Sequence, residues 1–234
     1  MKKTLLTICL VWMCFSLSAQ KIIDLSGKWS FSIDRQDNGE KEKWFSHTLN
    51  DFINLPGSMP EKLKGDEVTA KTQWTGSLYD SSYYYNPYME KYRKEGNIKF
   101  PFFLTPDKHY VGAAWYQKEV NIPADWKGER ILLFLERPHI ETTVWVNGQK
   151  TGMQNSLCVP HQYDITRYVR PGKCTITIRV DNRIKEINVG PDSHSITDQT
   201  QGNWNGIVGR ICLQTTPKTY FDDIQIYPEP EQKL

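Results

Sequence analysis

Several common protein classes leave signals that this sequence lacks. Its 29 lysines and arginines nearly balance its 27 aspartates and glutamates, so no excess of charge points to nucleic acid or an anionic membrane as a partner. The five cysteines are widely spaced, which indicates neither a disulfide framework nor a zinc site. No apolar run reaches the roughly 20 residues that a membrane-spanning helix needs. We therefore expect a globular protein without a nucleic-acid or membrane partner.

Catalytic motifs are missing as well. The sequence contains no phosphate-binding glycine loop, no GxSxG nucleophile turn and no paired histidines of the HExxH kind. A glycosidase usually needs two carboxyl groups that face each other across the scissile bond. Glu119 and Glu136 lie within or beside apolar strands, where a carboxylate more often pairs with a neighbouring cation, here Arg137 for Glu136. We predict no catalytic residue, metal or cofactor; a structural calcium ion would suit the polar loops, but no ligand spacing requires one.

Residues 1–19 have the pattern of a secretory signal peptide. Lys2 and Lys3 precede the apolar stretch Leu5–Leu17, which is followed by the small residue Ala19. We expect cleavage after Ala19 and export to the periplasm or the extracellular space. Removing two lysines leaves 27 positive and 27 negative side chains in residues 20–234. That length suits one domain with a sizeable core.

Short apolar segments with turn residues between them make up much of the remaining sequence. Alternation of apolar and polar residues is typical of a strand with one buried face. It occurs in four places, and a fifth segment is continuously apolar: Trp29 to Ile33, Tyr116 to Ile122, Ile176 to Val180, Ile224 to Ile226, and Ile131 to Leu135. Val144–Val146 runs into Asn147-Gly148, which predicts a tight hairpin. Because helical periodicity is scarce, we predict an all-β fold, an antiparallel β-sandwich of jelly-roll type.

One long region does not fit this pattern. Residues 62–99 are polar and charged, with tyrosines scattered among them and no sustained apolar period. We interpret the region as a Tyr-rich surface loop or insertion. Its tyrosines could form a binding platform or an interface with another domain, and the sequence does not separate the two.

A polar loop near the end of the chain carries the groups that bind sugars. A pyranose needs an aromatic ring for its apolar face and amides or carboxylates for its hydroxyls. Such groups gather between Asp198 and Gly206, with His161 as an additional candidate. The candidate sugar-binding residues are Asp198, Gln201, Asn203, Trp204, Asn205 and His161. The alternative is a polar turn in which Trp204 is a buried plug, and for Trp204 itself we favour burial.

Several segments, taken in order, resemble the N-terminal domain of family 2 glycoside hydrolases, the group of β-galactosidases, β-glucuronidases and β-mannosidases. The resemblance covers nearly all of residues 20–234. Its segments are Leu25 to Phe31, Ile53 to Ser58, Gly112 to Tyr116, Leu135 to Arg137, Val144 to Gly148, Tyr163 to Thr166, Val180 to Asn182, Asn203 to Ile211 and Asp223 to Pro228.

The resemblance implies a galactose-binding-like jelly roll that binds carbohydrate. In the family an immunoglobulin-like domain and a (β/α)₈ barrel follow, and the barrel carries both catalytic glutamates. A barrel alone takes about 250 residues, which is more than residues 20–234 provide. The resemblance, together with the signal peptide, therefore implies an exported, non-catalytic sugar-binding domain that is a fragment or truncated product. Its implied partners are carbohydrate and the two missing domains. Family members contact sugar from the loop before the Trp-x-Gly-Ile strand, where Asp198 is the nearest carboxylate, although some relatives carry an acid where this chain has Gly202 and Asn203.

Two other functions stay open at this point. The domain could act alone as a lectin, using the loop from Asp198 to Asn205 and exposed tyrosines. It could also be a structural module that docks against neighbouring domains and binds no sugar.

Overall fold

The computed structural model describes residues 20–76, 80–100, 104–185, 193–221 and 223–228. The predicted signal peptide lies outside these residues. Within the described ranges, no helix combines the length and the apolar character that a membrane crossing demands.

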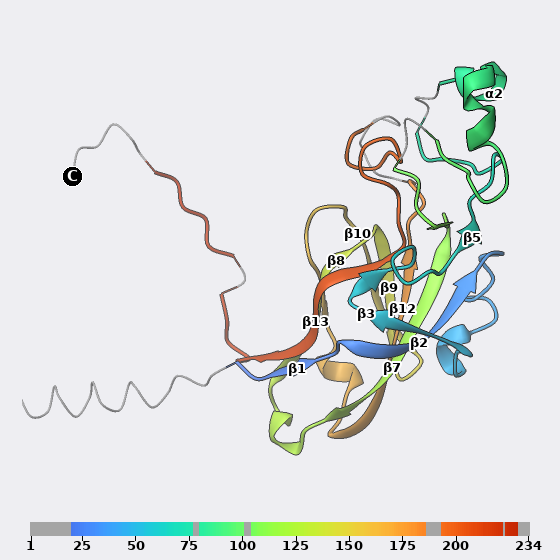
Figure 1. Cartoon of the computed structure of the whole chain (residues 1–234). Helices are drawn as coiled ribbons and strands as arrows, with labels where there is room; N and C mark the ends of the chain where they lie inside the picture. Colours follow the sequence, from blue (N-terminus) through green and yellow to red (C-terminus); the bar gives the residue numbers. More distant parts are fainter. Residues whose placement is uncertain (1–19, 77–79, 101–103, 186–192, 222, 229–234) are drawn as a thin grey trace, which may run out of the picture.

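Two antiparallel sheets form the body of the molecule (Figure 1). The first sheet has the order β1-β13-β8-β11, with β4 also paired to β13, and its strands are β1 (Ile22–Asp24), β4 (Gly57–Ser58), β8 (Arg130–Pro138), β11 (His161–Asp164) and β13 (Gly206–Thr216). The second sheet has the order β10-β9-β12-β7-β2-β3, and its strands are β2 (Gly27–Asp34), β3 (Asp51–Leu55), β7 (Ala113–Ile122), β9 (Glu141–Val146), β10 (Gln149–Asn155) and β12 (Gly172–Asp181). The chain crosses repeatedly between the sheets, as in a jelly roll. The predicted antiparallel β-sandwich is confirmed.

The core lies between the sheets and follows the predicted alternation. Trp29 and Phe31 of β2, Tyr116 of β7 and Leu133 and Leu135 of β8 are at most 1% exposed and belong to one apolar cluster. Burial of such large side chains contributes about 1.5–3 kcal/mol each to folding. The hairpin at Asn147-Gly148 is also confirmed, with φ angles of 50° and 76° that join β9 to β10.

The outer face of the six-stranded sheet is covered as well. Trp115 and Trp145 pack there with ring centroids 4.9 Å apart, beneath a segment that includes the short 3₁₀-helix η1 (Trp44–Ser46). Nε1 of Trp115 donates a hydrogen bond to the Asp34 carboxylate. A Cβ atom at Gly39 would lie 2.5 Å from the same Nε1, so only glycine lets the segment approach this closely. Adjacent residues of β7, Trp115 and Tyr116, are therefore both buried on opposite faces.

The described part of the predicted Tyr-rich region contains only short elements. Strands β5 (Asp66–Glu67) and β6 (Lys108–His109) pair at its base, and the region holds helices α2 (Ser82–Tyr85) and η2 (Pro87–Tyr92). Figure 1 shows α2 lying beyond one end of the sandwich. The remaining 3₁₀-helices, η3 (Ala124–Trp126) and η4 (Thr166–Tyr168), lie in connections between strands.

One predicted strand is wrong. Residues 223–228 form no strand, and Ile224 and Ile226 are 69% and 83% exposed. Strand β13, which precedes them, already has neighbours on both sides, and the alternating pattern by itself supplies no pairing partner. Strand β3 was not predicted from the sequence. It pairs with β2 at the edge of the six-stranded sheet.

Candidate functional site

The predicted sugar-binding loop is a series of turns held by its own backbone. The carbonyl oxygen of Thr197 accepts hydrogen bonds from the amides of Thr200, Gln201 and Gly202. Gly202 has a φ of +75°, a left-handed conformation that favours glycine. The loop then leads into β13 through Trp204 and Asn205.

Asp198 holds this loop against the Tyr-rich region. The side chain is 2% exposed, and its two oxygens accept hydrogen bonds of 2.6 Å from the amides of Thr75 and Asn203. Nε2 of His109 lies 3.4 Å from the same carboxylate. A carboxylate with several N–H partners is well stabilised without a ligand, so the structure places Asp198 in the interior as the link between two distant segments.

The two asparagines of the loop are also interior. Nδ2 of Asn205 donates to the carbonyls of Gly112 and Val180, and its Oδ1 accepts from the hydroxyl of Tyr116. Nδ2 of Asn203 donates to Thr75 and to the backbone of Asn182. These bonds fix the loop to the sandwich.

His161 lies inside the sandwich rather than on a loop. It is the first residue of β11, is 0% exposed, and donates from Nε2 to the carbonyl of Ser156. Its Nδ1 therefore accepts from the hydroxyl of Thr142, at 2.6 Å. Burial lowers its pKa, which favours the neutral ring. Its predicted contact with sugar remains a prediction, as do those of the three buried loop residues.

Gln201 and Trp204, the other two candidates, line an open cleft of about 550 Å³. Side chains from three segments, 136–139, 157–160 and 195–208, contribute to its walls. We call this hollow the Trp204 cleft. Gln201 is exposed and Trp204 is half-buried, so the alternative of Trp204 as a fully buried plug does not describe its position.

The indole of Trp204 is supported by a histidine. Its ring stacks on that of His139, with centroids 4.5 Å apart and planes 18° apart. Burial lowers the pKa of His139 to about 4, against smaller opposing effects of Asn203 and Asp198. His139 is therefore neutral near pH 7. Its Nε2 and Oδ1 of Asn203 are buried without a hydrogen-bond partner among the described residues.

The cleft has one acidic and one basic side chain among its described lining residues, Glu136 and Arg137. Glu136 accepts a hydrogen bond of 2.8 Å from the amide of Arg210, and Gly209 packs so closely that a Cβ there would lie 2.8 Å from the carboxyl carbon. The predicted structural role of Glu136 agrees with this contact, although its partner is a backbone amide and not Arg137. A single, engaged carboxylate does not form the facing pair that glycoside hydrolysis requires.

A second polar cluster lies at the end of β12. The carboxylate of Asp181, 0% exposed, contacts Arg179, Arg183 and Lys185. Asp37 and Glu141 complete the network by pairing with the same three cations. Burial alone would raise the pKa of Asp181, but the hydrogen bonds from Arg183 and Lys185 outweigh it and hold the pKa far below its usual value.

His139 and Arg137 were missed as candidates from the sequence. Their signal was weak, because Arg137 lies at the end of β8 and His139 directly follows that strand. Only the pairing of Arg137 with Val208 in β13 brings them beside Trp204. In the part of the chain that is described, no group of three or more His, Cys, Asp or Glu side chains is arranged to hold a metal ion.

Among curated proteins, the chain is similar to β-glucuronidases. It is 25% identical over 237 residues to the "Beta-glucuronidase" of Homo sapiens, covering 89% of this chain and 31% of that protein. It is 27% identical over 222 residues to the "Beta-glucuronidase" of Paenibacillus borealis, covering 88% and 31%. The chain thus spans less than a third of the length of these relatives.

Solved structures support the fold. The β-glucuronidase of an uncultured Clostridium sp. matches with a TM-score of 0.57 and 21% identity over 86% of this chain and 30% of that one. The apo β-glucuronidase of Ruminococcus gnavus matches with a TM-score of 0.58 and 17% identity over the same shares. The family model described as "Glycosyl hydrolases family 2, sugar binding domain" matches residues 22–217. This chain therefore belongs to the sugar-binding domain family of the family 2 glycosyl hydrolases.

Proposed function

We propose that this chain binds carbohydrate without cleaving it, as the sugar-binding part of a family 2 glycoside hydrolase whose reaction takes place on a separate (β/α)₈ barrel. The observation that carries the proposal is the Trp204 cleft, where an aromatic ring, an amide and a guanidinium group meet beside a single carboxylate that is already hydrogen-bonded.

The lining of the cleft suits a sugar. A half-buried indole offers a flat apolar surface for a pyranose ring, and Gln201 offers both a donor and an acceptor to its hydroxyls. Because the curated relatives are named β-glucuronidases, glucuronides are the first ligands to test.

Two assays on the purified chain test this function. In the first, nitrophenyl glucuronide, galactoside and mannoside are incubated with the protein, and we expect no release of nitrophenol above the buffer rate. A rate that Glu136→Gln abolishes would contradict the proposal.

In the second assay, chemical shifts of ¹⁵N-labelled protein are followed while methyl glycosides are added, and we expect saturable shifts. Absence of any shift across glucuronides, galactosides and mannosides would remove sugar binding.

We further propose that the protein is exported and that an immunoglobulin-like domain and a catalytic barrel are its partners. The first proposal is supported by the pattern of residues 1–19. Amino-terminal sequencing of the protein recovered outside the cytoplasm should show that the mature chain begins at Gln20.

The proposal about the partner domains is tested by sequencing the adjacent DNA, where we expect a reading frame that encodes the barrel.

Docking without sugar binding is a second candidate function, favoured by one observation. Beyond β13, Phe221, Ile224, Ile226 and Tyr227 are 69–87% exposed, and Figure 1 shows this segment running away from the sandwich. Exposed apolar groups of this kind are covered at interfaces. If docking is the whole function, replacing Ile224 and Ile226 with serine will abolish association with a co-expressed barrel, and sugar titrations will stay blank.

A further inference from the structure

We propose that the Trp204 cleft takes a pyranose that carries a carboxylate group, and that Arg137 is the residue that selects it. This inference rests on the proposed function, sugar binding in this cleft, and adds a substrate class and a selecting residue to it. It assigns the choice of an acidic sugar to the sandwich, through a residue at the end of β8.

The guanidinium group of Arg137 is unengaged. Arg137 is exposed on the cleft, and within the described chain its side chain has neither an ion pair nor a hydrogen bond. This contrasts with Arg179 and Arg183, whose guanidinium groups each contact two or more carboxylates. A guanidinium group forms two parallel hydrogen bonds with a planar carboxylate, which gives both affinity and orientation. A free Arg137 is therefore a receptor for a carboxylate that the protein itself does not supply.

The neighbouring charges leave this role to Arg137. The other ionisable side chains that line the described cleft are Glu136, His139 and Cys158. Glu136 is held by the amide of Arg210, and burial keeps His139 neutral near pH 7. The guanidinium group of Arg210 lies over the ring of Phe134, 4.8 Å from its centroid. Arg137 is thus the one cationic side chain among the described lining residues.

The remaining lining explains why the anion would be a sugar. The ring of Trp204 is held by the stacked ring of His139, so its orientation is set before a ligand arrives. A pre-oriented aromatic ring costs less conformational entropy on binding than a mobile one. Gln201 and Ser195 add polar groups to the lining of the cleft. A simple anion would use Arg137 but not the indole, whereas an acidic pyranose would use both.

The cleft also contains a chemical reporter. Cys158 is exposed and lines the cleft, whereas Cys174 and Cys212 are each 1% exposed. Burial raises the pKa of Cys174 to about 11 and also raises the pKa of Cys212, so their reactive thiolates are scarce. Alkylation of Cys158 by iodoacetamide, followed by peptide mass spectrometry, therefore reports directly on occupation of the cleft.

The test compares methyl β-D-glucuronide with methyl β-D-glucoside, which differ in a carboxylate against a hydroxymethyl group. We expect the glucuronide to bind on the order of tenfold more tightly and to slow alkylation of Cys158. Arg137→Ala should remove the preference while the glucoside still binds, and Arg137→Lys should restore part of it.

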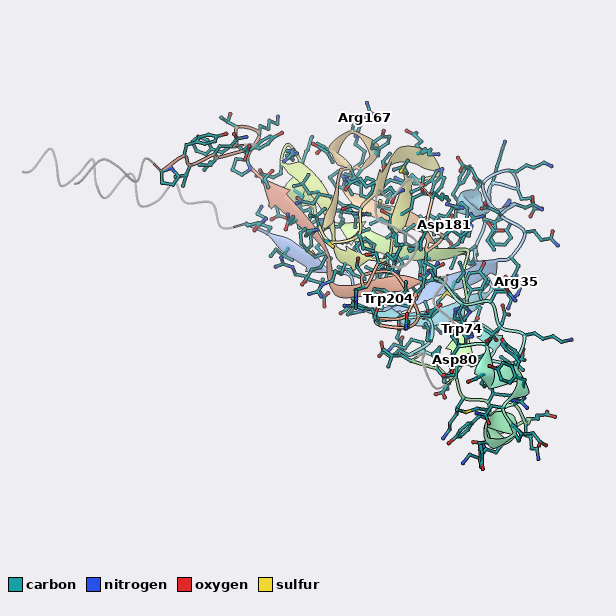
Figure 2. The ribbon with its side chains drawn as sticks, turned by 90° about the horizontal axis from the view of Figure 1, so that it is seen from above. Arg35, Trp74, Asp80, Arg167, Asp181 and Trp204 are labelled. Carbon is teal, nitrogen blue, oxygen red and sulfur yellow. The ribbon has the colours of Figure 1, made fainter. Side chains whose placement is uncertain are left out.

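The matched control is Arg167→Ala, which should change nothing. Arg167 is an exposed arginine on the opposite side of the sandwich from Trp204 (Figure 2). Because the ion pair lies near solvent, the preference should shrink as salt is raised.

The outcomes separate this inference from the proposed function. If neither glycoside shifts any resonance, sugar binding itself fails. If both bind equally, or if Arg137→Ala keeps the preference, sugar binding stands and the role of Arg137 is wrong. If sugars bind without protecting Cys158, the site lies elsewhere on the molecule. Binding of acetate with the affinity of the glucuronide would also overturn the inference, because it would show an anion site that does not recognise the sugar ring.

Discussion

The ion-pair network at the end of β12 and the Trp204 cleft are both rich in polar groups, yet they differ in how these groups are partnered. In the network, Asp37, Asp181 and Glu141 are matched by three cations, and Asp181 is 0% exposed. In the cleft, the side chains of Arg137 and Gln201 have no partner within the described chain and face solvent. Polar residues that satisfy each other build structure, whereas those left open on an aromatic-lined surface are available to a ligand.

The largest expected effect comes from the network. Asp181→Asn keeps the shape of the side chain but leaves Arg179, Arg183 and Lys185 near a neutral amide. Breaking a buried ion pair by removing one partner costs about 3–5 kcal/mol, so we expect a loss of stability in this range. Urea unfolding followed by tryptophan fluorescence measures it. Sugar binding should be unchanged at urea concentrations below the unfolding transition. If the variant is stable but no longer binds sugar, the ion-pair network and the Trp204 cleft belong to one site.

The next effect is a dependence of stability on pH that arises from His139, which lines the Trp204 cleft. The pKa of His139 is about 4 in the folded chain and about 6.5 when unfolded. The unfolded state therefore binds more protons between these values, and stability falls as pH decreases from about 6.5 to about 4. The shift corresponds to about 3 kcal/mol, and His161, whose pKa is also lowered by burial, acts in the same direction.

Urea unfolding at several pH values from 7 to 4 tests this dependence. His139→Gln should flatten the curve in that window, whereas the contribution of Asp181, whose folded pKa is depressed, is lost only at lower pH as carboxylates protonate. An unchanged slope in His139→Gln would show that the ring is accessible to protons in the folded protein and that its stack with Trp204 opens readily.

Much of the fold could be predicted because strand signals are local. Asn147-Gly148 predicts its hairpin from backbone preference alone, and Trp29 and Phe31 mark the inner face of β2 by simple alternation. Strand β3 was missed because only Ile53 and Leu55 of Asp51–Leu55 are buried, too short a pattern to stand out. Ile224 and Ile226 gave an equally short pattern, which was predicted as a strand, but they lack a partner strand among the described residues.

The site could be predicted only in outline, because partners of its residues are distant in the sequence. Asp198 is predicted as a sugar ligand, and its interior position could not be predicted because it depends on contacts with Thr75 and His109, 123 and 89 residues away. Two residues of the same loop, Gln201 and Trp204, line a cleft, and their contacts with sugar remain a prediction. Arg137 and His139 could not be added without the pairing of β8 with β13.

A smaller effect sharpens the division within the loop itself. Asn205→Ala removes hydrogen bonds to Gly112, Val180 and Tyr116, and unsatisfied buried groups together should cost about 2–3 kcal/mol. Thermal unfolding should show the loss, with affinity for glycosides retained in the folded fraction. Asn205→Asp would serve as a control of similar shape, because it keeps an acceptor for Tyr116 but loses both donors.

The smallest expected change in stability is at Gln201, on the open side of the same loop. Its side chain is exposed and unpartnered within the described chain, so Gln201→Ala should alter the free energy of unfolding by less than about 0.5 kcal/mol. Loss of one hydrogen bond to a sugar hydroxyl should still weaken glycoside binding about threefold to tenfold, as measured by chemical-shift titration. The pair Asn205→Ala and Gln201→Ala therefore separates folding from binding within five positions of one loop. If Gln201→Ala destabilises the fold, or leaves binding untouched, the open side of the loop is as structural as the buried one.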